Sequence, residues 1–323
     1  MEGIRFLKRP RPRKPFFVVA WPGMGEVAFK AASFIIESLK AKEFAFLEAA
    51  DFFYLTGSVI QKGIVDIPKL PESKFYFWKN KDGKNDLIIF LSNAQPDLSR
   101  AESYSQRIIQ MAKKYQAEMI ISFASMPQPI DHAQDSGVWF SATSQDIVSA
   151  LKKFGLRMLN EGMISGMNGL FLGVAKKEGL KGFSLLGEIP LYTIQIENPK
   201  ASAAVISALA KILAVDIDVS ALFEQAKNME NEINKLLDYM KPAAAPGQGP
   251  IGEDEVEKIK KALSQLTKLP ASVKDKIERL FSAAEQDLSR AGELKAELDK
   301  WNAYKEYEDR FLDLFRKSKE KGN

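Results

Sequence analysis

Residues 160–202 read NEGMISGMNGLFLGVAKKEGLKGFSLLGEIPLYTIQIENPKAS and place seven glycines between short apolar runs. Gly166, Gly169 and Gly173 precede an amphipathic helical pattern at spacings of three and four residues. Because glycine lacks a β-carbon, this spacing predicts close approach of one backbone segment to another. The stretch is therefore evidence about packing, and only Ser165 and Asn168 within it are candidate ligand contacts.

Short apolar runs alternate with amphipathic stretches on the N-terminal side of these glycines. Residues 16–21 (FFVVAW) have the pattern of a buried strand, and residues 25–40 have that of a helix with one apolar face. Apolar strands separated by helices of about ten or more residues indicate a mainly parallel sheet covered on both faces. The remaining elements predicted up to residue 124 are strands at 44–49, 75–78, 87–92 and 119–124 and a helix at 100–115.

The same alternation continues on the C-terminal side. Pro199 fits the first turn of a helix capped by Asn198, because proline lacks an amide hydrogen that this position would leave unpaired. Ser220 caps a second helix, whose wide apolar stripe requires a partner surface. The elements predicted here are helices at 144–154, 199–214 and 220–240, strands at 183–186 and 192–196, and an apolar segment at 162–174.

The two ends of the chain differ in composition from this α/β domain, which we place at residues 16–240. Residues 1–15 are rich in Arg, Lys and Pro, which predicts a flexible basic arm that is either solvated or in contact with RNA or an acidic partner. Residues 241–252 (KPAAAPGQGPIG) have the composition of a linker. Residues 253–323 predict a helical hairpin or coiled coil, which is either a solvated extension or a partner-docking arm.

Composition excludes several classes of function. The 323 residues include no cysteine and one histidine, His132, so sites built from thiolate or several imidazole ligands are excluded, and we predict no metal and no cofactor. No apolar run is long enough to span a bilayer, and no secretory signal is recognisable, so the cytoplasm is the expected compartment. A net charge of +4, much of it in the arm, argues against general nucleic-acid binding.

One motif has the form of a phosphate-binding turn. Residues 23–28 (GMGEVA) match GxGxxA between a strand and a helix, and Glu48 follows about twenty residues later, as in dinucleotide-binding folds. Glycines at a helix N-terminus let the backbone approach a pyrophosphate. However, Pro22 removes an amide just before the first glycine, and any tight strand-to-helix turn needs small residues. The motif therefore indicates a tight turn, an anion or nucleotide site, or a dinucleotide site.

A second polar segment, residues 125–134 (SMPQPIDHAQ), follows a strong strand and so lies at the carboxyl edge of the sheet, where α/β proteins usually bind ligands. His132 stands beside Asp131, Asp135, Ser125 and Ser136, which are the residue types of a nucleophilic triad. No GxSxG elbow accompanies them. We therefore predict no catalytic residue here and interpret His132 as a surface residue, with a catalytic role as the alternative.

Four blocks of sequence, in this order, resemble the PAC2 family of proteasome-assembly-chaperone-like proteins. The resemblance covers about residues 16–240, and the four blocks are WPGMGEVAFKAA, GMISGMNGLFLGVAKKEG, FSLLGEIPLY and NPKASAAVISALAKILAVDIDVSALFEQA. It implies a three-layer α/β/α fold similar to nucleoside phosphorylases, homo-oligomerisation, and a role in assembling proteasome rings for some members. Family chaperones that dock on proteasome rings often end in a hydrophobic-tyrosine-any tail, whereas residues 320–323 here read EKGN.

Two hypotheses of function follow. The first is a non-catalytic, homo-oligomeric assembly-chaperone-like or scaffold protein that contacts a protein partner through its C-terminal helices. The second is a nucleoside- or nucleotide-class binding protein or enzyme. Its pocket would be edged by Gly23, Met24, Gly25, Ser125, Ser165 and Asn168.

Overall fold

The structure is a computed structural model that describes residues 3–48, 50–55, 57–81, 83, 85–240, 271–300 and 303–320. The chain divides into two compact units, one formed by Met1–Tyr54 with Leu70–Pro246 and the other by Leu55–Lys69 with Gly247–Asn323. We call them the body and the appended unit, and describe each by itself. The predicted linker at 241–252 and the predicted helical stripe of Val256, Ile259, Leu263 and Leu266 lie outside the described residues.

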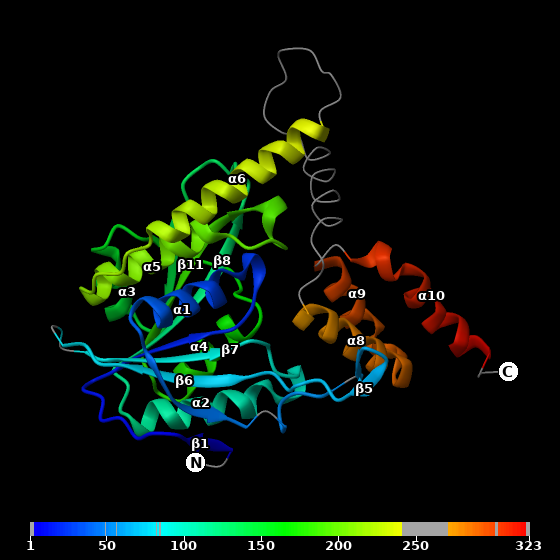
Figure 1. Ribbon diagram of the computed structural model, residues 1–323, viewed down its shortest axis with the longest axis horizontal. Coiled ribbons are helices and arrows are strands. Elements are labelled where there is room, and N and C mark those ends of the chain that lie inside the picture. Colours follow the sequence, from blue (N-terminus) through cyan, green and yellow to red (C-terminus); the bar gives the residue numbers. More distant parts are fainter. Residues whose placement is uncertain are drawn as a thin grey trace. The chain divides into compact units, whose positions relative to one another are not determined.

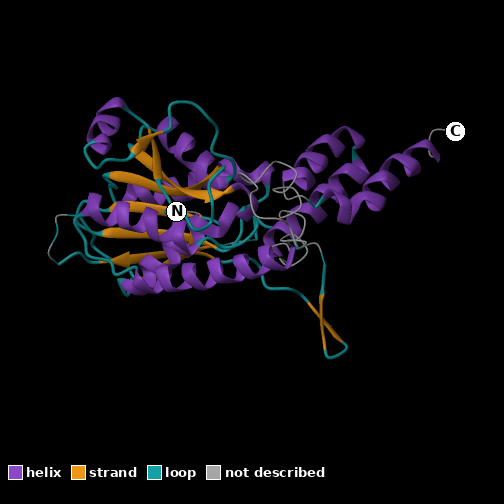
Figure 2. Ribbon diagram, turned by 90° about the horizontal axis from the view of Figure 1, so that it is seen from above, coloured by secondary structure: helices purple, strands orange, loops and turns teal. Residues whose placement is uncertain are grey.

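The body is built on a nine-stranded mixed sheet (Figures 1 and 2). In spatial order the strands are β1 (Ile4–Phe6), β3 (Lys42–Leu47), β6 (Ser73–Trp78), β7 (Leu87–Ser92), β2 (Phe16–Ala20), β8 (Met119–Gln128), β11 (Gly182–Pro190), β9 (Val138–Ala142) and β10 (Arg157–Met158). Its four central strands, β7, β2, β8 and β11, run parallel, whereas the flanking strands pair antiparallel except for β9 and β10. This confirms the predicted α/β fold with its parallel sheet.

Helices pack on the sheet through two separate hydrophobic clusters. Val18 and Ala20 of β2 belong to one cluster, and Phe17 and Val19 belong to the other, as the alternation of side chains along a strand requires. The first cluster includes side chains of α1 (Val27–Ser38), α3 (Gln145–Lys152), α5 (Pro199–Leu213) and the start of α6 (Ser220–Met240). The second includes side chains of α2 (Ala101–Lys114) and α4 (Met167–Lys177), and Figure 1 shows α1 and α2 on opposite sides of the sheet.

Part of the N-terminal segment, Ile4–Phe6, forms a strand where the sequence predicts a flexible arm. Ile4 is buried, and β1 pairs antiparallel with β3. Farther along, the backbone N–H of Arg13 donates to the buried carboxylate of Asp86 at 2.7 Å. The basic residues thus lie next to Ile4, which is buried and belongs to the sheet. A prediction from the composition of residues 1–15 does not detect this single apolar residue. A second correction concerns the strand predicted at 192–196, because a short 3-10 helix, η3 (Leu191–Thr193), follows β11 instead.

The appended unit contains a β-hairpin and C-terminal helices. The hairpin joins β4 (Val59–Gln61) to β5 (Ile64–Asp66) through Lys62 and Gly63, which both have positive φ, as a type I′ turn requires. The helices α8 (Ala271–Gln286), α9 (Ala291–Lys300) and α10 (Tyr304–Glu320) pack around a hydrophobic core of their own. The described part of the extension is therefore more than the predicted two-helix hairpin. No helix within the described ranges is both long and apolar enough to cross a lipid bilayer.

Candidate functional site

The carboxyl edge of β2, β8 and β11 is the place where the sequence predicts a ligand pocket. Of the six candidate residues, Gly23, Met24 and Gly25 form the loop after β2, and Ser125 lies in β8 opposite Gly187 of β11. Ser165 is exposed in the loop before α4, and Asn168 is buried in the first turn of that helix. The structure brings Gly23 next to Asn168, since a β-carbon on Gly23 would lie 3.3 Å from Asn168 Nδ2.

Asn168 is fully engaged by the backbone of Trp21. Its Oδ1 accepts from the Trp21 N–H at 3.0 Å, and its Nδ2 donates to the Trp21 carbonyl at 2.9 Å. Gln95 makes a similar link, because its Nε2 donates to the Pro22 carbonyl at 2.8 Å and its Oε1 accepts from the Met167 N–H at 3.2 Å. The two amides join the end of β2 to the start of α4, so the polar atoms of Asn168 serve the fold.

The glycine turn likewise directs its amides to protein carbonyls. Gly25, at φ 62°, donates its N–H to the Ile194 carbonyl at 2.9 Å, and the Glu26 N–H donates to the Gly23 carbonyl at 3.0 Å. Burial, together with the charge of nearby Glu197, raises the pKa of Glu26 to about 7. A partly buried carboxyl at this helix start opposes phosphate binding. Glu48, the acidic residue of the dinucleotide motif, pairs with Arg5 at 2.6 Å. The geometry therefore favours the tight-turn interpretation.

His132 is buried, and both of its ring nitrogens have partners. Nδ1 lies 2.8 Å from the hydroxyl of Tyr192, and Nε2 lies 2.8 Å from Oδ1 of Asn234 in α6. Because an amide oxygen only accepts, Nε2 carries the proton, and the Tyr192 hydroxyl donates to Nδ1 while accepting the His132 backbone N–H at 2.8 Å. Burial raises the pKa of Tyr192 to about 12, which keeps this hydroxyl protonated.

Asp131 Oδ1 lies 3.6 Å from His132 Nδ1, but Nε2 faces Asn234 rather than a serine hydroxyl, so the triad that the residue types allow does not form. The hydroxyl of Ser136 donates to the carbonyl of Glu188 at 2.7 Å. The carboxylate of Glu188 accepts from the Gly137 N–H at 3.0 Å and from Trp139 Nε1 and Arg157 Nη1, both at 2.7 Å. The polar side chains around His132 thus tie loops to the sheet, and His132 is a buried structural residue rather than a surface one.

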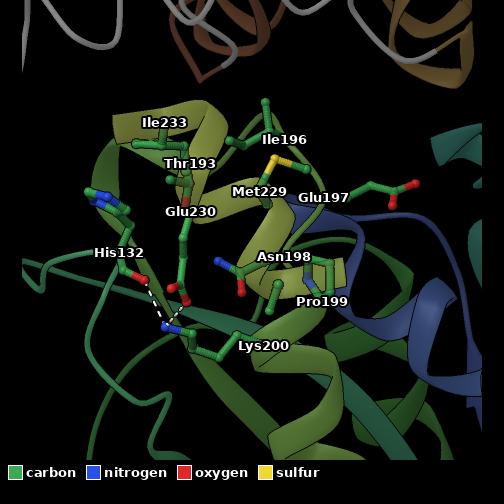
Figure 3. Close-up of a pocket in the computed structure, with 11 residues that line it drawn as sticks. His132, Thr193, Ile196, Glu197, Asn198, Pro199, Lys200, Met229, Glu230 and Ile233 are labelled. Atoms are coloured by element: carbon green, nitrogen blue, oxygen red, sulfur yellow. Dashed lines mark hydrogen bonds and ion pairs between the residues drawn. The ribbon is translucent and has the colours of Figure 1, made fainter. Parts of the chain in front are cut away.

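Lys200 completes the attachment of α6 to this edge. Its Nζ donates to the His132 carbonyl at 2.8 Å and to the Gln134 carbonyl at 3.0 Å, and it forms an ion pair with Glu230 of α6 (Figure 3). None of the sequence motifs contains Tyr192, Lys200, Glu230 or Asn234 as a candidate site residue. The available signal was the spacing of Glu230 and Asn234, which lie four residues apart beside the apolar stripe of α6.

The space beneath α6 is too small for a ligand. The cavity between α6 and the start of α5 has a volume of about 20 Å³, and its lining includes His132, Asn198 and Met229. Such a volume holds about one water molecule. Small-molecule sites usually occupy several hundred Å³. This part of the carboxyl edge is therefore closed by the chain itself.

An apolar surface is present instead on the hairpin of the appended unit. Ile60 and Val65 are cross-strand partners, and Ile67 follows directly after the end of β5. Their exposed fractions are 68%, 65% and 76%, and Ile64 on the other face is 72% exposed. We call Ile60, Val65 and Ile67 the hairpin face. Contiguous exposed apolar residues of this kind mark surfaces that bind proteins or membranes.

Comparison with known proteins gives a consistent result. The model of the PAC2 family matches residues 17–237. Pyrococcus furiosus PbaB, described as an archaeal proteasome activator, is 31% identical, with a TM-score of 0.63, and the match covers 72% of this chain and 98% of PbaB. Pyrococcus furiosus PbaA, described as an archaeal homolog of proteasome-assembly chaperone, is 26% identical, with a TM-score of 0.56 and coverage of 73% and 97%. The uncharacterized protein MJ1210 of Methanocaldococcus jannaschii is 27% identical over 238 residues, which are 72% of this chain and 88% of that protein.

Proposed function

The chain belongs to the PAC2 family, and on that basis we propose that it is a non-catalytic, homo-oligomeric protein that acts as an assembly chaperone or scaffold in the cytoplasm. The relatives support the direction of this proposal, because PbaB is described as a proteasome activator and PbaA as a homolog of a proteasome-assembly chaperone. Oligomers would form through the body, and a protein partner would bind the appended unit. The proteasome, or one of its subunits, is the partner that these descriptions suggest.

The hairpin face is the observation that carries the proposal. An isolated two-stranded hairpin is at best marginally stable in water, and burying an apolar face is what makes such a sheet persist. Three β-branched side chains, each about two-thirds exposed or more, therefore suit contact with another protein. The sequence also suggests the C-terminal helices as a docking arm. In α8 and α9, however, Ile277, Phe281 and Leu294 lie fully buried in the core of these helices, so these side chains stabilise the appended unit.

The nucleotide-class alternative has less support. The Gly25 and Glu26 amides of the glycine turn, the side chain of Asn168 and the ring of His132 all bond to other groups of the protein. The cavity beneath α6 has a volume of about 20 Å³. A ligand at this edge would have to displace these contacts, and each unpaired buried polar group would cost about 1–3 kcal/mol.

The proposal is tested by measuring binding of the full-length protein to purified 20S proteasome and to isolated α subunits from the same organism. Replacing Ile60→Ser together with Ile67→Ser removes apolar contact area from the hairpin face, and we expect at least about tenfold weaker binding. Met163→Ser is the matched control, because Met163 is 89% exposed but lies in the body. Absence of binding by the unchanged protein, or equal losses in both variants, would count against the proposal.

A further inference from the structure

A second cavity, with a volume of about 370 Å³, lies in the body at another part of the carboxyl edge. Asp51, Phe52 and Tyr54 line it from the segment that follows β3, and Arg100, Ser103 and Arg107 line it from the start of α2. Strands β3 and β7 run in the same direction, because each pairs antiparallel with β6. The cavity therefore lies where both strands end, which is the usual position of ligands in α/β folds.

The two sides of this cavity are joined by backbone and side-chain contacts. The Asp97 N–H donates to the Phe52 carbonyl at 3.0 Å, and Arg100 Nε donates to the Tyr54 hydroxyl at 3.3 Å. The Tyr54 hydroxyl accepts this bond and so keeps its own proton for another acceptor. A volume of about 370 Å³ falls within the range of small-molecule sites, in contrast to the cavity beneath α6.

The chemistry of the lining suits an anion. Arg100, Ser103 and Arg107 are spaced by three and four residues, which places their side chains on one side of the α2 segment. Guanidinium groups present paired N–H donors that match the oxygens of carboxylates and phosphates. Asp51 adds a carboxylate to the same cavity, which would repel a simple anion but would accept a hydrogen bond from a ligand hydroxyl or amine.

We propose that this cavity binds a small ligand that carries an oxyanion group, either a carboxylate or a phosphate. Arg100 and Arg107 hold the oxyanion, the Tyr54 hydroxyl donates to it, and Asp51 accepts from a hydroxyl or amine elsewhere on the ligand. The proposed assembly role does not depend on this site. None of the six candidate residues named from the sequence lines this cavity.

The chain supplies a matched control for this proposal. The sequence DLSRA occurs at residues 97–101 and again at 287–291. In both copies the aspartate side chain accepts from the serine N–H, at 2.9 Å and 3.0 Å. Arg290 occupies the position of Arg100 in the second copy and pairs with Glu293 at 3.2 Å. Changing Arg290 therefore removes the same charge from the same local structure outside the cavity.

Titration calorimetry on the full-length protein at low ionic strength tests the site, with inorganic phosphate and succinate as separate probes. We expect saturable binding of at least one probe with one site per chain. Phosphate binding alone would identify a phosphoryl ligand, and succinate binding alone would identify a carboxylate ligand. Arg100→Gln and Arg107→Gln should each weaken binding at least about tenfold, and Arg290→Gln should leave it unchanged.

Two results would overturn the proposal. The first is that neither probe binds saturably at concentrations of about 1 mM or below. The second is that Arg290→Gln weakens binding as much as Arg100→Gln, which would indicate a general effect of net charge. Because Arg107 is half-buried, its variant is first checked by thermal unfolding, and Arg100→Gln, at an exposed position, decides the matter if Arg107→Gln does not fold.

Discussion

Glu26 occupies an unfavourable position at the start of α1. Its φ of 50° lies in the left-handed region, and its side chain is partly buried near the acidic Glu197. Its pKa is raised to about 7, mainly by burial and to a smaller extent by the negative charge of Glu197. Because the folded state retains the proton more strongly than the unfolded chain does, folding and protonation of this carboxyl are linked.

The linkage predicts that stability falls as pH rises. The unfolded carboxyl titrates near 4.5 and the folded one near 7, so the free energy of unfolding decreases between these values and levels off above about pH 7. The size of the loss is at most about 3 kcal/mol. Urea unfolding of the unchanged protein and of Glu26→Gln, at several pH values, checks this. In Glu26→Gln the free energy of unfolding should decrease less steeply between pH 4.5 and about pH 7 than in the unchanged protein. An equal pH dependence in the two proteins would contradict the assignment to Glu26.

Asn168 illustrates how a candidate ligand residue can be told from a structural one. Asn168→Ala leaves the buried N–H and carbonyl of Trp21 without these partners, so we expect destabilisation of about 3 kcal/mol. Ser165→Ala changes an exposed residue and should alter stability by less than about 0.5 kcal/mol. Denaturant unfolding measures both. Equal, small effects would reopen a ligand-binding role for Asn168.

The glycines of residues 160–202 make different contributions to the helix α4. A β-carbon on Gly169 would lie 1.9 Å from the carbonyl oxygen of Ile164, whereas one on Gly173 would have no atom within 4 Å. The first glycine is therefore required by close backbone approach, as the sequence predicts. The second is exposed and its position tolerates a side chain, so the close approach predicted at Gly173 is wrong.

These two positions give a paired prediction. Gly169→Ala should destabilise the body by about 1–3 kcal/mol, because the loop before α4 must shift. Gly173→Ala should stabilise it by about 0.5–1 kcal/mol, since alanine loses less entropy than glycine in a helix. Thermal and denaturant unfolding of the two variants would show the opposite signs. Destabilisation by Gly173→Ala would mean that the exposed face of α4 is covered by a partner.

Elements with long, regular patterns were predictable from the sequence. The strand predicted at 87–92 coincides with β7, and the helix predicted at 220–240 coincides with α6. The strand at 192–196 was wrong, because the apolar run there is short and folds into η3 after the proline that ends β11. Short runs of this kind do not distinguish strand from turn without tertiary contacts.

The sequence contains local signals for the hairpin at residues 59–66 and for the turn after α8. The pattern VIQ-KG-IVD at residues 59–66 places a Lys-Gly pair between apolar runs, which is typical of a hairpin with a type I′ turn. Asp287 caps the 3-10 turn Leu288–Arg290 that follows α8, and Asp97 caps the equivalent turn Leu98–Arg100 before α2. The network of Lys200, Glu230 and Asn234 could not be predicted, because it joins segments that only the fold brings together.

At the scale of the whole molecule, the chain combines a PAC2-family body with an appended unit that has its own core. The polar groups that the sequence offers for ligand chemistry beneath α6 hold the body together instead. The hairpin carries a group of exposed apolar residues, with Ile60, Ile64, Val65 and Ile67 each at least 65% exposed. Polar groups that bond within the body and apolar residues that are exposed on the hairpin both agree with the proposed role in binding other proteins.

Size-exclusion chromatography with multi-angle light scattering on the full-length protein tests the central proposal most directly. A homo-oligomeric scaffold should elute at micromolar concentration with a mass that is a multiple of 36.1 kDa. That mass should persist in the Ile60→Ser and Ile67→Ser double variant, because the proposal assigns oligomer formation to the body and partner binding to the hairpin face. A mass of 36.1 kDa for the unchanged protein across the micromolar range would contradict the account.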